Sequence, residues 1–167
     1  MYGITLTPCD SISVYNKDVK TYIVKDADDS LLGVFYSDYM PRASKRSGAW
    51  MSNFREQQEG VRPLIYNVAS FTKPAGDLPS LLTIDEARTM YHEFGHALHG
   101  LLTQCKYKGV SGTSVAQDFV ELPSQIMEHW AVEPEVLKLY AKHYETREVI
   151  PDELITKIQN QGTCLLY

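Results

Sequence analysis

The sequence is poor in cysteine and has no long apolar run, and each shortage excludes a class of protein. Its three cysteines, Cys9, Cys105 and Cys164, are odd in number and far apart, and they form no C-x-x-C pair. We therefore expect no disulfide framework. We expect instead reduced thiols in a cytosol-like compartment. No stretch approaches the roughly 20 apolar residues that a membrane-spanning helix needs. The first residues show no basic segment followed by an apolar one, so no signal peptide is visible and we expect a cytoplasmic protein with no membrane partner.

Positive charge is also in short supply. The chain has 16 Lys and Arg against 21 Asp and Glu, a net charge of −5. A general nucleic-acid binder needs clustered Lys and Arg for the phosphates, so no nucleic-acid partner is expected. The 44% apolar content is too high for a disordered chain, and 167 residues fit one globular domain or part of a larger one. Residues 162–167 form an apolar tail, which is unfavourable when exposed, so we expect a piece of a longer protein.

The first part of the chain, residues 1–80, is predicted to form a small antiparallel sheet. Residues 19–24 and 31–36 are rich in β-branched and aromatic side chains and flank a polar turn, a pattern typical of a hairpin. Residues 64–71 are predicted to form a third strand, which ends before the prolines and glycine of residues 74–79. A basic loop, residues 41–48, lies between the hairpin and the third strand. Its charged side chains, Arg42, Lys45 and Arg46, are interpreted as solvated.

The second part, residues 81–161, is predicted to be helical. Thr83 and Glu86 have the T-x-x-E spacing of a capping box, so a helix should begin there. Its buried stripe is predicted from apolar residues at helical spacing, namely Ala87, Tyr91, Phe94, Leu98 and Leu101. A second helix is expected over residues 118–131, started or kinked near Pro123. Further helices are expected from Pro134 and from about Pro151, followed by the tail. The fold class predicted is thus α+β, in a single unit.

The first helix contains the motif H-E-x-x-H, formed by His92, Glu93 and His96. Residues four apart lie one above the other on a helix, so both imidazoles can bind one metal ion. Glu93 lies about 100° around the helix, beside the metal, where its carboxylate can take a proton from a water molecule. Zinc suits this set, because it takes imidazole and carboxylate ligands and leaves a position open.

A catalytic zinc ion needs a third protein ligand. His99 is seven residues after His92, about 10 Å along the axis, and cannot share one ion with both histidines. His129 is interpreted as a packing or surface residue. Glu121 is the better candidate: it lies 25 residues after His96 in the apolar run Phe-Val-Glu-Leu, where an ionised carboxylate needs a partner. We therefore predict one zinc ion bound by His92, His96 and Glu121.

The sequence around these residues resembles the thimet oligopeptidase and peptidyl-dipeptidase family of zinc metallopeptidases, particularly its bacterial peptidyl-dipeptidase branch. The resemblance rests on HEFGHALHG at 92–100, SGT at 111–113, DFVELPSQ at 118–125, and similar stretches at 35–54 and 62–68. It implies a zincin-like core in which His92, His96 and Glu121 bind zinc and Glu93 is the general base. It also implies hydrolysis of short peptides, with release of C-terminal dipeptides.

The resemblance carries two further expectations. Residues 64–71 would form the sheet edge with which a substrate backbone pairs. Family members are several times longer, and their Tyr and His residues that stabilise the tetrahedral intermediate follow the zinc site. Since these residues are missing here, together with the N-terminal helical part, we expect a truncated core with reduced or no activity. Substitute donors among Tyr66, Tyr107 and His129 are interpreted as structural residues instead.

Several alternatives stay open from the sequence. Asp118, Gln125 and Glu128 share a helix face with Glu121, and any of them could hold the second ring nitrogen of a histidine ligand. The chain could also be a non-catalytic zinc-binding module, which would need four ligands, or a metal-free scaffold fragment of a larger peptidase.

Overall fold

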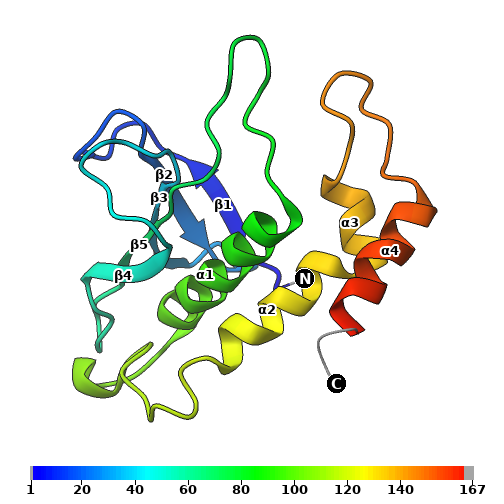
Figure 1. Ribbon diagram of the computed structural model, residues 1–167. Coiled ribbons are helices and arrows are strands. Elements are labelled where there is room, and N and C mark those ends of the chain that lie inside the picture. Colours follow the sequence, from blue (N-terminus) through cyan, green and yellow to red (C-terminus); the bar gives the residue numbers. More distant parts are fainter. Residues whose placement is uncertain (1, 164–167) are drawn as a thin grey trace.

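The computed structural model describes residues 2–163 and has the α+β architecture predicted from the sequence (Figure 1). Five strands come first: β1 (Thr5–Pro8), β2 (Lys20–Lys25), β3 (Leu31–Asp38), β4 (Trp50–Arg55) and β5 (Leu64–Val68). The helices follow: α1 (Ile84–Leu102), the 3₁₀ helix η1 (Lys108–Val110), α2 (Leu122–Val132), α3 (Pro134–Tyr140) and α4 (Asp152–Thr163). No helix within residues 2–163 is both long and apolar enough to cross a membrane.

The sheet is mixed, with strand order β1-β2-β3-β5-β4. The β2–β3 hairpin is present as predicted, and β1–β2 and β4–β5 are also antiparallel. The prediction of a purely antiparallel sheet is wrong at one pair, because β3 and β5 run parallel. The chain leaves β3, forms β4 at the edge of the sheet, and returns as β5 between the two. The prediction that residues 64–71 form a free edge is therefore also wrong: β5 is paired on both sides, and the edge strands are β4 on this side of the sheet and β1 on the other.

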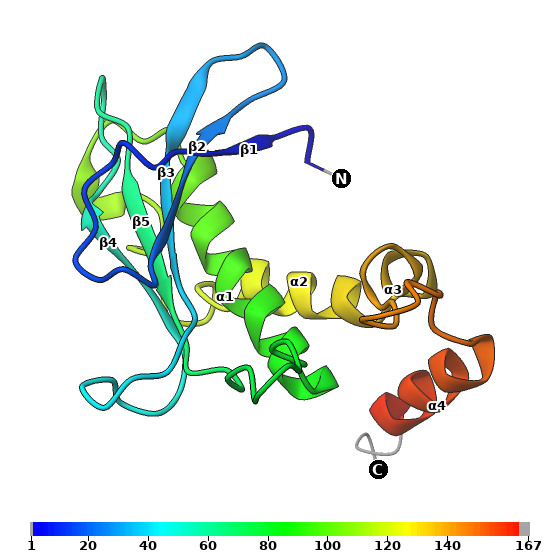
Figure 2. The same cartoon turned by 90° about the horizontal axis from the view of Figure 1, so that it is seen from above.

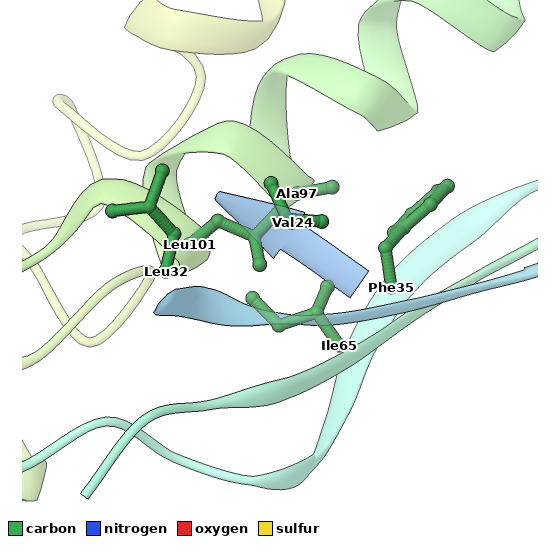
Figure 3. Packing of buried hydrophobic residues seen from close by; sticks show 6 residues of the cluster. All are labelled: Val24, Leu32, Phe35, Ile65, Ala97 and Leu101. Atoms are coloured by element: carbon green, nitrogen blue, oxygen red, sulfur yellow. The ribbon is translucent and has the colours of Figure 1, made fainter. Parts of the chain in front are cut away.

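Helix α1 lies against the sheet and contacts β3, β4 and β5 (Figure 2). It begins with the predicted capping box. The Thr83 side chain accepts a hydrogen bond from the Glu86 backbone N–H, and the Glu86 side chain accepts one from the Thr83 backbone N–H. The main core lies between helix and sheet (Figure 3), and its buried members are Val24, Leu32, Phe35, Ile65, Ala97 and Leu101. Three residues of the predicted stripe are buried and two, Tyr91 and Phe94, are partly buried.

The remaining helices extend from α1 away from the sheet (Figure 2). Helix α2 begins at Leu122, which agrees with the start predicted near Pro123 and not with one at residue 118, and Pro123 stands in its first turn. Helix α3 begins at Pro134 as predicted and buries Leu137. Helix α4 buries Ile155 but leaves Leu154 exposed, and it continues to Thr163, two residues into the predicted tail. Residues 164–167 of that tail, with Cys164, lie outside the described residues.

Candidate metal centre

The two histidines of the motif project from the same face of α1. His92 and His96 are separated by one helical turn, and their ring centroids are 4.9 Å apart with the ring planes at 81°. Their side chains keep 25% and 12% of their surface exposed, so one side of each ring is open while the other is packed. The regular helix that follows the Thr83 cap is what fixes this spacing.

Glu121 enters the site from the residue that precedes α2. Its Oε2 atom lies 3.3 Å from His92 Nε2 and 3.1 Å from His96 Nε2. The Ser124 hydroxyl donates to the same oxygen at 2.8 Å and fixes the carboxylate in place. This hydrogen bond is the main cause that lowers the pKa of Glu121, and the neighbouring imidazoles add to it. The carboxylate is thus held ionised, as a metal ligand must be.

The separations fit a metal ion as the common partner. One ligand atom of each of His92, His96 and Glu121 lies within 4.8 Å of the others. Two ligand atoms that each lie about 2.1 Å from a tetrahedral zinc ion are themselves about 3.4 Å apart. The observed 3.1 and 3.3 Å match this, and both exceed the 2.7–2.9 Å of a strong charge-assisted hydrogen bond. The residues therefore fit zinc in both chemistry and spacing.

Glu93 lies on the adjoining face of α1, next to the edge strand. Its side chain is buried, and the backbone of Met51 in β4 lies near enough to lower the pKa of its carboxyl group. Burial raises the pKa of Glu93 above the ordinary value, and the positive field of His92 opposes the rise. A carboxylate with a raised pKa can both take up and release a proton near neutral pH, which suits a general base. The Met51 contact was missed by sequence reasoning, because a backbone donor leaves no signal in the sequence.

Of the three candidates for holding a histidine, the structure selects Glu128. Its Oε1 atom lies 2.5 Å from His92 Nδ1, on the side of the ring opposite Glu121. Asp118 and Gln125 are exposed and take no part in this contact. The His96 Nδ1 atom is buried and has no hydrogen-bond partner within residues 2–163.

Close packing of α1 on α2 brings these groups together. Gly95 lies between the two histidines in the motif, and a Cβ atom there would come within 2.6 Å of the Ser124 Cα and 2.7 Å of the Pro123 carbonyl oxygen. Only glycine permits this approach, which places the start of α2, with Glu121, beside the imidazoles.

The other polar candidates lie elsewhere. His99 is in edge contact with the Phe119 ring, and His129 is exposed. The Tyr66 ring stacks on Phe54 at 4.5 Å, and Tyr107 is 66% exposed. None of these four belongs to the group of ligand atoms found within residues 2–163.

Comparison with known proteins identifies the family of the chain. The profile of peptidase family M3 matches residues 1–166. The chain belongs to peptidase family M3. It is 45% identical over 162 residues to the dipeptidyl carboxypeptidase of Escherichia coli strain K12, an alignment that covers 96% of this chain and 24% of the relative. Oligopeptidase A of the same strain is 42% identical over 164 residues, with 95% and 24% covered.

A plant relative extends the range of the family. The organellar oligopeptidase A of Arabidopsis thaliana is 41% identical over 169 residues, with 95% of this chain and 21% of the relative covered. Membership of family M3 confirms the resemblance noted from the sequence. The chain spans about a quarter of the length of these curated relatives.

Proposed function

We propose that the chain is the zinc-binding core of a metallopeptidase that hydrolyses peptide bonds in short oligopeptides. One observation carries the proposal: three ligand atoms from α1 and the start of α2 converge at separations suited to one ion, with a buried carboxylate beside them. In this proposal His92, His96 and Glu121 are the ligands and Glu93 is the general base. When bound, zinc supplies the Lewis acidity that activates a water molecule and polarises a peptide carbonyl.

The residues of the chain perform the proton transfers. Glu93 takes a proton from the attacking water and later delivers it to the leaving amine, a role for which its raised pKa is suited. The Met51 backbone, which lowers the pKa of Glu93, puts this carboxylate beside β4. Glu121, ionised by its bond to Ser124, keeps its negative charge beside the imidazoles.

The free edge of β4 is the place where an extended peptide can pair. β4 is bonded to β5 on one side only, so the backbone groups of its other side are available to a substrate strand. The same strand contacts Glu93 through Met51, which would bring a paired peptide close to the general base. Release of C-terminal dipeptides is the favoured specificity, because the relatives include a dipeptidyl carboxypeptidase.

We propose further that these 167 residues by themselves hydrolyse peptides orders of magnitude more slowly than a relative of full length. Each oxyanion donor removed from an active site typically costs about 2.7–4 kcal/mol of transition-state stabilisation. In this proposal Tyr66, whose ring stacks on Phe54, and the largely exposed Tyr107 are structural residues and do not act as substitute donors.

The test combines metal analysis with hydrolysis of a short peptide. The wild-type chain should retain one zinc ion after dialysis, and Glu93→Gln should retain it too while losing hydrolysis. His96→Ala should lose both. A chain without zinc would favour the metal-free scaffold, and hydrolysis unchanged in Glu93→Gln would refute the role of Glu93. Zinc without any hydrolysis, even when the chain is part of a full-length protein, would favour a non-catalytic zinc module.

A further inference from the structure

The two candidate histidine ligands are held in different ways. His92 has a carboxylate on each side of its ring: Glu128 at 2.5 Å from Nδ1 and Glu121 at 3.3 Å from Nε2. His96 has only Glu121, at 3.1 Å from Nε2, and its Nδ1 is buried without a partner in the part of the chain described. His96 is the more buried of the two side chains, 12% exposed against 25%. Packing thus positions His96, whereas a specific acceptor positions His92.

The contact to Glu128 has a chemical consequence for the ring. A neutral imidazole carries its proton on one nitrogen, and the other nitrogen offers the lone pair that a metal needs. An ionised carboxylate can only accept, and His92 has one on each side. Glu128 is 2.5 Å from Nδ1, whereas the Glu121 oxygen is 3.3 Å from Nε2 and also faces His96, so the closer contact favours the form protonated at Nδ1 and leaves Nε2 as the electron-pair donor. Nε2 is the atom that faces Glu121 and the ligand group.

We propose that Glu128 is the positioning residue of the site: it fixes the tautomer and the ring orientation of His92 before any metal arrives. This inference rests on the proposed function, in which His92 is a zinc ligand. Glu128 and Glu121 are seven residues apart, at one end and the middle of the same helical segment, so the packing of α2 on α1 brings both carboxylates to His92 together. Partners of this kind typically change metal affinity about 10–100-fold when removed.

Three variants of the full 167-residue chain distinguish the effect of losing the hydrogen-bond acceptor from the effect of changing a residue on α2. Glu128→Ala removes the acceptor and should weaken zinc binding by about 10–100-fold, as measured by competition with a chelator. Glu128→Gln keeps a carbonyl oxygen that can accept from Nδ1 and should recover part of the loss. Gln125→Ala is the matched control, since Gln125 is exposed one turn earlier on α2 and should leave zinc affinity unchanged.

A second readout does not depend on zinc. In the metal-free chain, ¹⁵N resonances recorded on the neutral His92 ring should show a protonated Nδ1 and an unprotonated Nε2. Glu128→Ala should lose this preference, and Gln125→Ala should keep it. If Glu128→Ala fails to fold, the wild-type spectrum and the zinc affinity of Glu128→Gln still test whether Glu128 positions His92.

The outcomes distinguish this inference from the proposed function. A wild-type His92 with its proton on Nε2, or a Glu128→Ala chain that binds zinc as tightly as Gln125→Ala, overturns the positioning role and leaves the metallopeptidase proposal intact. A wild-type chain that binds no zinc, but whose His92 is protonated at Nδ1 in a Glu128-dependent way, refutes the zinc site and supports the contact.

Discussion

A buried lysine anchors the loop that leads into the edge strand. The Lys45 side chain is 4% exposed, and its ammonium donates to the Asp38 carboxylate and to the backbone carbonyls of Asp38, Met40 and Ala69. Asp38 is also held by both guanidinium nitrogens of Arg42. The interpretation of Arg42 and Lys45 as solvated loop residues is wrong, because a buried carboxylate at the end of β3 attracts both of them.

Lys45→Met should destabilise the chain by about 3 kcal/mol, because it leaves a buried carboxylate and three carbonyls with fewer donors. Urea unfolding measures the difference. Arg46→Met is the matched control, since Arg46 is an exposed cation in the same loop and its loss should change stability by less than about 0.5 kcal/mol. Equal effects of the two substitutions would contradict the anchoring role of Lys45.

The same carboxylate predicts a dependence of stability on pH. Burial of Asp38 raises its pKa, but hydrogen bonds from Arg42, Tyr15 and Lys45 outweigh burial and leave the pKa below the ordinary value. The stabilisation is therefore complete above the unfolded pKa of about 3.9 and is lost as the pH falls through the lower folded pKa. Asp38→Asn should lose less stability than wild type between about pH 7 and pH 3. Asp118→Asn, at an exposed site, should match wild type, and a wild-type pH profile in Asp38→Asn would be inconsistent with this account.

Single residues are predictable where the chemistry itself requires a spacing. His92, Glu93 and His96 form a motif with a physical reason, and Glu121 is an acid in an apolar run, so the sequence alone singles out all four. Lys45 and the Met51 backbone carry no such mark, since their partners lie on other elements. Glu128 is an intermediate case. Helix periodicity makes it one of three candidates for the partner of a histidine, and only the packing of α2 on α1 brings it to His92.

At the scale of elements, the contact between α1 and α2 places Glu121. Gly95→Ala would bring a methyl group against the Ser124 Cα and the Pro123 carbonyl, both backbone atoms that cannot turn aside. The helices must then separate, and we expect a loss of about 1–3 kcal/mol in stability together with weaker zinc binding. Thermal unfolding and chelator competition measure the two effects.

Gly109→Ala provides the control for that substitution. No atom lies within 4 Å of a Cβ built at Gly109, so the added methyl group meets open space. Its stability and zinc affinity should stay close to those of wild type. If Gly95→Ala behaves like this control, the close approach of the helices is not what positions Glu121.

Element order depends on information that a local pattern does not contain. The capping box and apolar spacing predicted α1 because a helix is stabilised within its own sequence. β1 and β4 were not predicted, and β5 was assigned to an edge, because strand order is decided by pairing between distant segments. Because β5 lies between β3 and β4, residues 64–68 pair with residues 34–38 on one side and with residues 50–55 on the other. A local sequence pattern does not reveal which strands pair.

At the scale of the whole molecule, the candidate site is where the two halves of the fold meet. The sheet contributes the edge strand β4 and its contact to Glu93, α1 contributes both histidines, and α2 contributes Glu128 and the acid that precedes it. A metal ion at this place would add ligand bonds to helices that already touch through packing and through the contacts of His92 and His96 with Glu121 and Glu128. Metal binding should therefore be coupled to the stability of the entire chain.

Zinc should raise the melting temperature of the wild-type chain, because an ion that binds only the folded state adds RT ln(1 + [L]/Kd), about 2.7 kcal/mol at one hundred times Kd. For a chain of this size that corresponds to a rise of roughly 5–10 °C, which excess chelator should reverse. Glu93→Gln should show the full rise, since Glu93 is not among the ligand atoms, whereas His96→Ala should show almost none. An equal rise in His96→Ala and wild type would mean that zinc binds the folded chain somewhere other than between α1 and α2, and the proposed ligand set would have to be abandoned.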